Sequence, residues 1–457
     1  IYIDPVSFGN ASLIGGNLRA IAFEYDEKQK IVTAKRYPYD PRTGLLDLSV
    51  EGSTVADAEI RDRLEDILDY HVIIGDVEEI DSETGTGYKY FQTKGRGTVY
   101  FDWNPADVNL PEGQALASKV KGGYQVETER IDTFATEKIT VKTRYDQSRN
   151  SATNGNGRTY VIDRPLLTSR LSVYDILSDS VNYPEFKEFF YLISQAGVNN
   201  VGLFSKTMNN HATASQNLVT LNTYHYTLYV PTEKALKDLY KTGRLYTLAM
   251  IDSIKQVYDD NIADIGEFRG NPAEKVQASY DKIMNMFNNY ANMVKNSSDA
   301  IPTAILNDPV AKDSVFYTTP WYGKYTAKME KQITDFVKYH IQDNSVYANG
   351  KFTIDLRENP LGEANYETAY MNVHSQFVKL GVKYDHKRNK IFVVDAETDK
   401  ELRADPAYNA ASTEGKISMR EARAKVIDPT VAISSSGKPL YNIMCREYEY
   451  NTNDVST

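Results

Sequence analysis

Cysteine is almost absent from this chain of 457 residues, which contains Cys445 alone. A single cysteine excludes an intrachain disulfide, a cysteine-rich metal site and a redox pair. It does not place the protein in a reducing compartment, because a chain of this length can bury a core without covalent cross-links. The length itself indicates two or three domains.

The chain also lacks an excess of positive charge and any long apolar run. Its 52 Lys and Arg residues and 62 Asp and Glu residues give a formal net charge of −10. An acidic surface repels nucleic acid and anionic lipid, so we expect neither as a main partner. No run of about 18 apolar residues is present, and we expect no transmembrane span. The sequence begins at Ile1 rather than Met, so we expect a processed or truncated N-terminus, with any lipid anchor outside this sequence.

Sequence signatures of catalytic, cofactor and metal sites are missing as well. The six histidines show no HExxH spacing, and no G-x-S-x-G elbow marks a catalytic serine. The acidic run at residues 76–81 lacks the spacing of an EF-hand loop, and we interpret it as a solvated edge. We therefore expect no catalytic residue, no cofactor, no metal and no enzyme activity. A hydrolase, the enzymatic alternative, would need Asp, Glu or His clustered in a pocket.

Tyrosine, by contrast, is abundant, with 34 residues against two Trp. Its side chain offers a large, stiff contact area with one polar end, and it is enriched where proteins bind their ligands. A tyrosine-rich surface would suit a protein or sugar ligand. The alternative is that the count reflects composition alone.

Hydrophobic periodicity predicts a mixture of strands and helices. The clearest unit is residues 224–239, where a strand is stopped by Pro231 and followed by a helix with Thr232 as its N-cap. Helices are predicted over residues 53–70, 171–177 and 183–196, and a further helix is predicted to lead into Tyr339. Strands are predicted over 18–25, 30–37, 88–93, 98–101, 124–131, 138–144, 160–167, 366–374, 378–384 and 390–395.

A repeated junction decides the predicted architecture. Tyr70-His71 and Tyr339-His340 each follow a helix, and each precedes a hairpin, further strands, a loop of small polar residues and a terminal strand. This order predicts two copies of one α+β module. The two histidines are candidates for a function, but we favour the alternative that each makes a local hydrogen bond at the end of its helix.

Several of these stretches resemble the fasciclin domain, in tandem. Residues 226–236 (YTLYVPTEKAL) are similar to the first conserved block of that family, and residues 336–342 (FVKYHIQ) are similar to its later Tyr-His block. In the first copy, residues 67–77 (ILDYHVIIGDV) match the later block and residues 155–167 (GNGRTYVIDRPLL) resemble the closing strand. The first copy has no Pro-Thr block. In the second copy the interval between residues 239 and 334 is much longer than is usual for the family.

The resemblance implies an α+β fold of two tandem fasciclin-like β-sandwich or wedge domains with flanking helices. The first domain would cover residues 1–168, with a divergent or truncated N-terminal half. The second would cover residues 169–457 and carry a long helical insert at about 241–332.

The function that the resemblance implies is non-enzymatic binding or adhesion at a cell surface, with a protein or a glycan as ligand. The Asn- and Tyr-rich composition resembles that of surface lipoproteins of the Bacteroidetes. This resemblance implies a location at the bacterial outer membrane or cell surface, where the protein would be lipid-anchored or exported to the periplasm. The alternative is a structural accessory lipoprotein in an outer-membrane transport or assembly complex, with a barrel partner.

Candidate interaction residues fall in two groups. The insert has an apolar stripe that would suit a partner or would simply pack on its own domain. In some animal members of the family the Tyr-His region has been implicated in integrin recognition, a partner that a bacterial chain would not meet. The candidates are Met286, Phe287, Tyr290 and Met293 in the insert, and Tyr70, His71, Tyr339 and His340 at the junctions.

Overall fold

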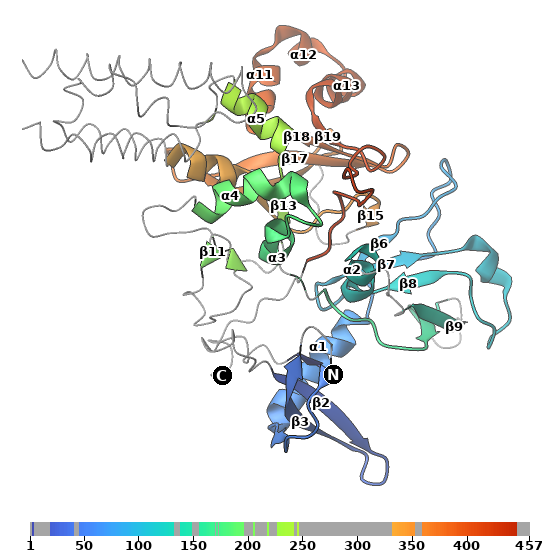
Figure 1. Ribbon diagram of the computed structural model, residues 1–457. Helices are drawn as coiled ribbons and strands as arrows, with labels where there is room; N and C mark the ends of the chain where they lie inside the picture. Colours follow the sequence, from blue (N-terminus) through green and yellow to red (C-terminus); the bar gives the residue numbers. More distant parts are fainter. Residues whose placement is uncertain are drawn as a thin grey trace, which may run out of the picture.

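The computed structural model (Figure 1) shows an α+β protein, as the sequence predicts. It describes residues 2–3, 19–40, 45–131, 138–148, 155–169, 171, 173–195, 204–205, 217–218, 226–241, 245, 331–351 and 359–445. The predicted insert at about 241–332 falls almost wholly outside the described residues. Its candidates Met286, Phe287, Tyr290 and Met293 lie outside them too.

A small antiparallel sheet with one helix forms the N-terminal unit. Its strands are β1 (Tyr2–Ile3), β2 (Arg19–Asp26), β3 (Ile31–Asp40), β4 (Leu45–Leu46) and β5 (Ser53–Thr54). Helix α1 (Asp57–Tyr70) packs on this sheet through a core of Ile21, Ala34, Val55 and Ile60. The β2–β3 hairpin agrees with the predicted strands. The helix was expected from residue 53, but Ser53–Thr54 pairs with β3 instead.

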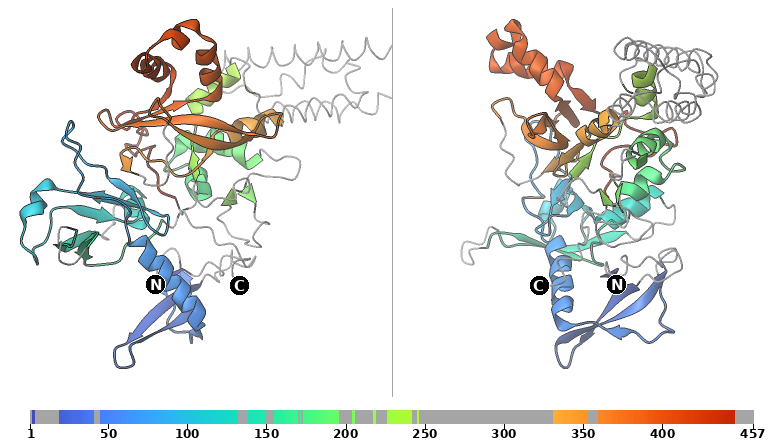
Figure 2. Two further views of the ribbon diagram at one scale, coloured as in Figure 1. Left: turned by 180° about the vertical axis from the view of Figure 1, so that it is seen from behind. Right: turned by 90° about the vertical axis from the view of Figure 1, so that its left-hand side faces the viewer.

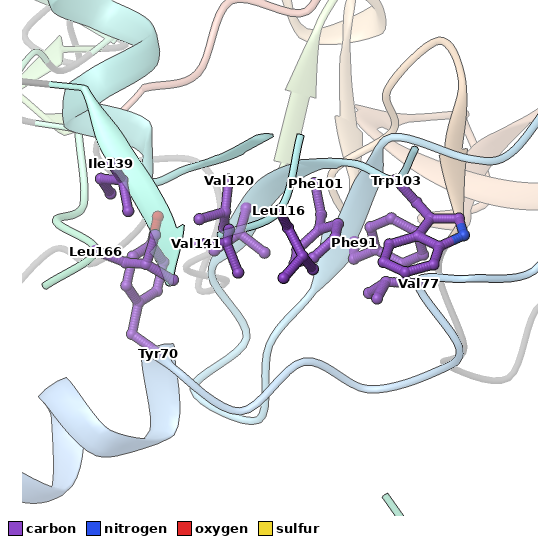
Figure 3. Close-up of a cluster of buried hydrophobic side chains, with 11 residues drawn as sticks. Tyr70, Val77, Phe91, Phe101, Trp103, Leu116, Val120, Ile139, Val141 and Leu166 are labelled. Carbon is purple, nitrogen blue, oxygen red and sulfur yellow. The ribbon is translucent and has the colours of Figure 1, made fainter. Parts of the chain in front are cut away.

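The central sheet follows in the chain. It runs in the order β10-β9-β8-β7-β6-β15, and β15 (Gly350–Lys351) joins it in parallel from the C-terminal half. Its core is the cluster drawn in Figure 3, which includes Phe91, Val99 and Phe101. The other elements are β6 (Tyr90–Gln92), β7 (Thr98–Asp102), η3 (Pro105–Asn109), β8 (Lys119–Lys121), α2 (Gly123–Ile131), β9 (Ile139–Asp146) and β10 (Arg158–Ile162).

The prediction of a strand over residues 124–131 is wrong, because this segment is helix α2. Its buried side carries Gln125 and Glu127, whose side-chain oxygens accept hydrogen bonds from backbone N–H groups of Gly122 and Leu171. A helix with a polar buried side leaves no apolar stripe at helical spacing for sequence analysis to detect.

The third sheet runs in the order β13-β14-β16-β17-β18-β19. Its core includes Tyr366, Leu380 and Ile391. The strands are β13 (Tyr226–Leu228), β14 (Ile341–Asp343), β16 (Ala364–Met371), β17 (Phe377–Asp385), β18 (Lys390–Val394) and β19 (Lys425–Ile427). They agree with the strands predicted near 226, 366, 378 and 390.

Helices flank this sheet in sequence and in space. The N–H of Ala235 donates to Thr232 Oγ1 (3.4 Å), which agrees with the predicted N-cap of α5. The helices are α3 (Val173–Ser178), η4 (Pro184–Phe186), α4 (Lys187–Gln195), α5 (Glu233–Lys241), residues 331–339, α11 (Ala396–Ala404), α12 (Pro406–Ala410) and α13 (Thr413–Arg423). A short pair of strands, β11 (Phe204–Ser205) and β12 (Asn217–Leu218), completes the described elements.

The three sheets follow one another along the molecule (Figures 1 and 2). The N-terminal unit, in blue, lies at one end and the third sheet with α11–α13, in orange and red, lies at the other. The central sheet, in cyan, lies between them. The predicted first domain therefore contains two separate sheets, one of which is completed by β15 from the C-terminal half.

Candidate functional site

The first Tyr-His junction is fully engaged within the fold. Tyr70 is 6% exposed, and its hydroxyl donates to the carbonyl of Thr98 (2.9 Å) and accepts from the N–H of Gly123 (3.0 Å). His71 Nδ1 donates to the carbonyl of Ile67 (2.6 Å), while Nε2 accepts from the N–H of Leu166 (2.9 Å). Both ring nitrogens of His71 thus have partners in the chain.

The second junction repeats this geometry. His340 Nδ1 donates to the carbonyl of Phe336 (2.7 Å), and the Tyr339 hydroxyl accepts from the N–H of Ala396 (2.7 Å). In both junctions the Tyr and His ring centroids lie 6.4 Å apart with an interplanar angle of 89°. Burial lowers the pKa of His340 and raises that of Tyr339 to about 12.

The shared geometry gives the two tyrosines a positioning role inside the protein. Gly123 is the first residue of α2 and Ala396 is the first residue of α11, so each hydroxyl accepts an N–H that has no partner within its own helix. This arrangement gives Tyr70, His71, Tyr339 and His340 hydrogen bonds within the chain.

Replacing Tyr70 with Phe should lower the free energy of unfolding by about 1–3 kcal/mol, because it leaves the Gly123 N–H and the Thr98 carbonyl buried without this partner. Chemical denaturation of the variant and of wild type measures the difference. Tyr145→Phe, at an exposed position on β9, is the matched control and should change stability by less than about 0.5 kcal/mol. Equal effects of the two variants would contradict the assigned role.

A second group of aromatic residues lies between the central and third sheets, and we call it the tyrosine seam. It consists of Tyr88, Tyr90, Tyr100, Tyr347, Tyr384 and His386. Tyr90 is stacked on Tyr347, with centroids 5.3 Å apart, and meets the edge of Tyr100, also at 5.3 Å. Tyr88 is stacked on His386 at 4.4 Å. Five of the six side chains are partly exposed, and Tyr347 is buried.

Strand register explains how the seam forms. Tyr90 pairs with Tyr100 across β6 and β7, and Tyr100 pairs with Lys121 across β7 and β8, so the three side chains share one face. Phe91 and Val99, one residue along, point into the core on the other face. The C-terminal half then adds Tyr347, just before β15, Tyr384 on β17 and His386, just beyond the end of β17.

Charged groups border the seam in opposite pairs. Lys121 Nζ lies 5.2 Å from the Tyr100 ring centroid and Lys351 Nζ lies 5.4 Å from that of Tyr88, both within the range of cation–π attraction. Lys89 pairs with Asp102 at 3.1 Å, and Lys121 pairs with Glu129 at 2.5 Å. Burial and the Asp102 carboxylate raise the pKa of Tyr100, so its hydroxyl stays protonated. The seam therefore offers ring surfaces with hydrogen-bonding groups and little net charge.

A loop of the first half closes one end of the seam. Residues 80–87, the light-blue loop that Figure 1 shows reaching toward the third sheet, contact the turn between β17 and β18. The His386 Nε2 lies 3.1 Å from the Thr86 carbonyl, and Lys387 forms an ion pair with Glu83. The loop is held in shape by Asp81, whose carboxylate accepts from the Thr84 N–H (2.7 Å); this hydrogen bond lowers the pKa of Asp81.

The acidic run at residues 76–81 is not a solvated edge throughout, which corrects the sequence interpretation. The Glu78 side chain is 6% exposed and accepts two hydrogen bonds from Arg144, at 2.5 and 2.7 Å. Tyr160 donates to the same carboxylate (2.5 Å), and Arg158 lies 3.3 Å from it. The bond to Glu78 raises the pKa of Arg144, and burial raises that of Tyr160. Glu78 thus fastens the loop that leads to the seam.

Other properties of the described residues bear on the sequence expectations. No group of three or more His, Cys, Asp or Glu among them is placed to hold a metal ion. None of the helices in the described part of the chain has the length and apolar character needed to cross a bilayer. Comparison of the sequence and structure with protein-family models, curated proteins and solved structures gave no match.

Sequence reasoning did not find the tyrosine seam as a site. Its members come from residues 88–100 and 347–386, and nothing in their local spacing links the two segments. The high tyrosine count was the one signal that pointed toward such a surface.

Proposed function

We propose that this protein is a non-enzymatic binding protein of the fasciclin type, which recognises a protein or glycan ligand at the outer surface of a bacterial cell. In this proposal the two halves are tandem fasciclin-like domains, and the tyrosine seam between them is the ligand-binding surface. The repeated Tyr-His junction supports the tandem arrangement, since both copies place a Tyr hydroxyl on the first N–H of a helix.

The tyrosine seam is the observation that carries the proposal. Its five partly exposed aromatic rings form two contacting groups, one on Tyr88 and one on Tyr90, and offer stiff, amphipathic side chains. Such side chains lose little conformational entropy on binding and combine apolar area with a hydroxyl group. The paired charges around them favour a ligand with little net charge.

The test is capture of ligand from a membrane extract of the source organism by the full chain and by Tyr100→Ala. Removing the ring should reduce capture about tenfold or more, as for an aromatic anchor at the centre of an interface. Treating the extract with periodate, which cleaves vicinal diols of sugars, or with protease identifies a glycan or a protein ligand.

Tyr145→Ala provides the matched control, because Tyr145 is an exposed tyrosine of the same sheet outside the seam. It should capture as much as wild type. Equal capture by Tyr100→Ala, with the variant shown to be folded by circular dichroism, would overturn the assignment of the seam as the binding surface.

A further inference from the structure

The turn between β16 and β17 carries a group of exposed apolar side chains, which we call the apolar tip. Met371 is 47% exposed, Val373 is 93% exposed and Phe377 is 41% exposed. Met371 and Phe377 face each other as a cross-strand pair, and Val373 lies two residues from Met371 in the turn. Three apolar side chains are thus gathered at the end of one hairpin, where water contact is unfavourable.

The turn holds this shape through its own hydrogen bonds. The Asn372 side-chain carbonyl accepts from the N–H groups of His374 (2.9 Å) and Gln376 (3.1 Å). The Asn372 N–H donates to the Gln376 carbonyl (2.9 Å), and the Ser375 N–H donates to the Asn372 carbonyl (3.0 Å). The four N–H groups of Asn372, His374, Ser375 and Gln376 therefore have partners within the turn and would not lose a bond to water on entering an apolar medium.

Charge is absent from the same segment. Residues 368–378 contain no Asp, Glu, Lys or Arg, although a quarter of the whole chain is charged (25%). The nearest charged pair on the hairpin, Glu367 with Lys379 at 3.4 Å, lies behind the tip. Burial of the tip would therefore require no charged group to leave water.

We infer that the apolar tip inserts into the surface of a lipid bilayer. It is an exposed turn with four internally bonded N–H groups and no Asp, Glu, Lys or Arg, which suits a soft apolar medium. The chain's net charge of −10 makes a zwitterionic surface the favoured target, since an anionic one would repel it.

The geometry of β17 gives this insertion a consequence for the proposed seam. The tip includes Phe377 at one end of β17, and Tyr384 and His386 lie at or just beyond the other end of that strand. A strand of 9 residues spans roughly 27 Å at about 3.4 Å per residue. A protein inserted by the tip would hold the seam away from the lipid, although the inference of insertion does not depend on the seam.

The experiment is flotation of the full, unlipidated chain with vesicles of phosphatidylcholine. Wild type should float with the vesicles, and raising the salt from 50 to 500 mM should not release it, because the contact is apolar. The triple variant M371S/V373S/F377S should bind the vesicles more weakly than wild type, by about tenfold or more. V181S/V431S, which alters two exposed valines elsewhere, should behave as wild type.

Two results would overturn the inference. One is that the wild-type chain stays unbound at millimolar lipid. That result is also expected if the tip fits an apolar pocket of another protein instead of a bilayer. The other is a triple variant that floats as well as wild type. Matching thermal unfolding of wild type and the triple variant shows that any difference arises at the tip rather than from loss of fold.

Discussion

Glu363→Gln is expected to destabilise the C-terminal half by about 3–5 kcal/mol, because it breaks a buried ion pair and leaves the other charge behind. Arg420 and Glu363 are both buried, and the guanidinium donates to both carboxylate oxygens, at 2.7 and 2.8 Å. Arg420 also donates to Asp399 (2.6 Å). These hydrogen bonds join α13, α11 and the start of β16. Burial lowers the pKa of Arg420, but the hydrogen bonds outweigh it and the net pKa is raised.

The measurement for Glu363→Gln is hydrogen–deuterium exchange of peptides covering β16, β17 and α13, which reports local stability in a chain with several sheets. Glu367→Gln is the matched control, because Glu367 lies on the same strand and makes an exposed pair with Lys379. That change should cost less than about 1 kcal/mol. A similar loss of protection in both variants would show that the Arg420 pair contributes no more than a surface contact.

A double variant separates the effect of charge pairing on stability from the effect of side-chain packing. Replacing both Glu363 and Arg420 with Met also removes the buried charge that has lost its bidentate partner, so the double variant should be more stable than Glu363→Gln. If the double variant is the less stable of the two, packing at this position rather than charge pairing controls stability.

Local sequence signals predicted the hairpins and the junctions well. The β2–β3 hairpin has a polar turn in which Asp26 accepts from the N–H groups of Lys28 and Gln29. The β6–β7 hairpin has Arg96 at a positive φ of 62° between two glycines. In both cases the turn chemistry lies within a few residues, so a local reading captures it.

The predictions failed where burial involves polar groups or distant segments. Helix α2 buries Gln125 and Glu127, and α13 buries Arg420, so neither shows a clear apolar stripe. Residues 396–423 consequently carried no helix prediction, although the structure places α11, α12 and α13 there. The seam depends on pairing between β6 and β15, two strands separated by much of the chain, which no local pattern encodes.

The Glu78 network also joins distant segments, because Glu78 bonds to Arg144 and Tyr160. Its neighbour Asp146 shows how acid should act on the fold. The hydrogen bonds from Ser148 and the charges of Arg158 and Arg144 hold the pKa of Asp146 below its ordinary value. A lowered carboxylate pKa contributes stability that is fully present above the pKa of the unfolded chain and is lost as pH falls through the folded value. Acid should therefore weaken the contacts that Asp146 makes with Arg144 and Arg158 on β9 and β10.

Glu78→Ala is expected to cost about 3–5 kcal/mol at neutral pH, because the buried Glu78 carboxylate is the shared acceptor of Arg144 and Arg158, whose side chains are only 13% and 15% exposed. The Tyr160 hydroxyl loses its acceptor in the same step. Chemical denaturation measures the loss. The control is Glu83→Ala, which removes an exposed partner of Lys387 from the neighbouring loop and should cost less than about 1 kcal/mol.

The same substitution also tests whether the acidic loop supports the seam. Glu78 fastens residues 75–81, and the chain then runs through Thr86, which contacts His386, to Tyr88, which is stacked on it. Release of the loop should therefore loosen one end of the seam and lower ligand capture, even under conditions where the variant is still folded. If Glu78→Ala loses stability but captures ligand as well as wild type does, the rings anchored on β6 and β7 must form the binding surface without the loop.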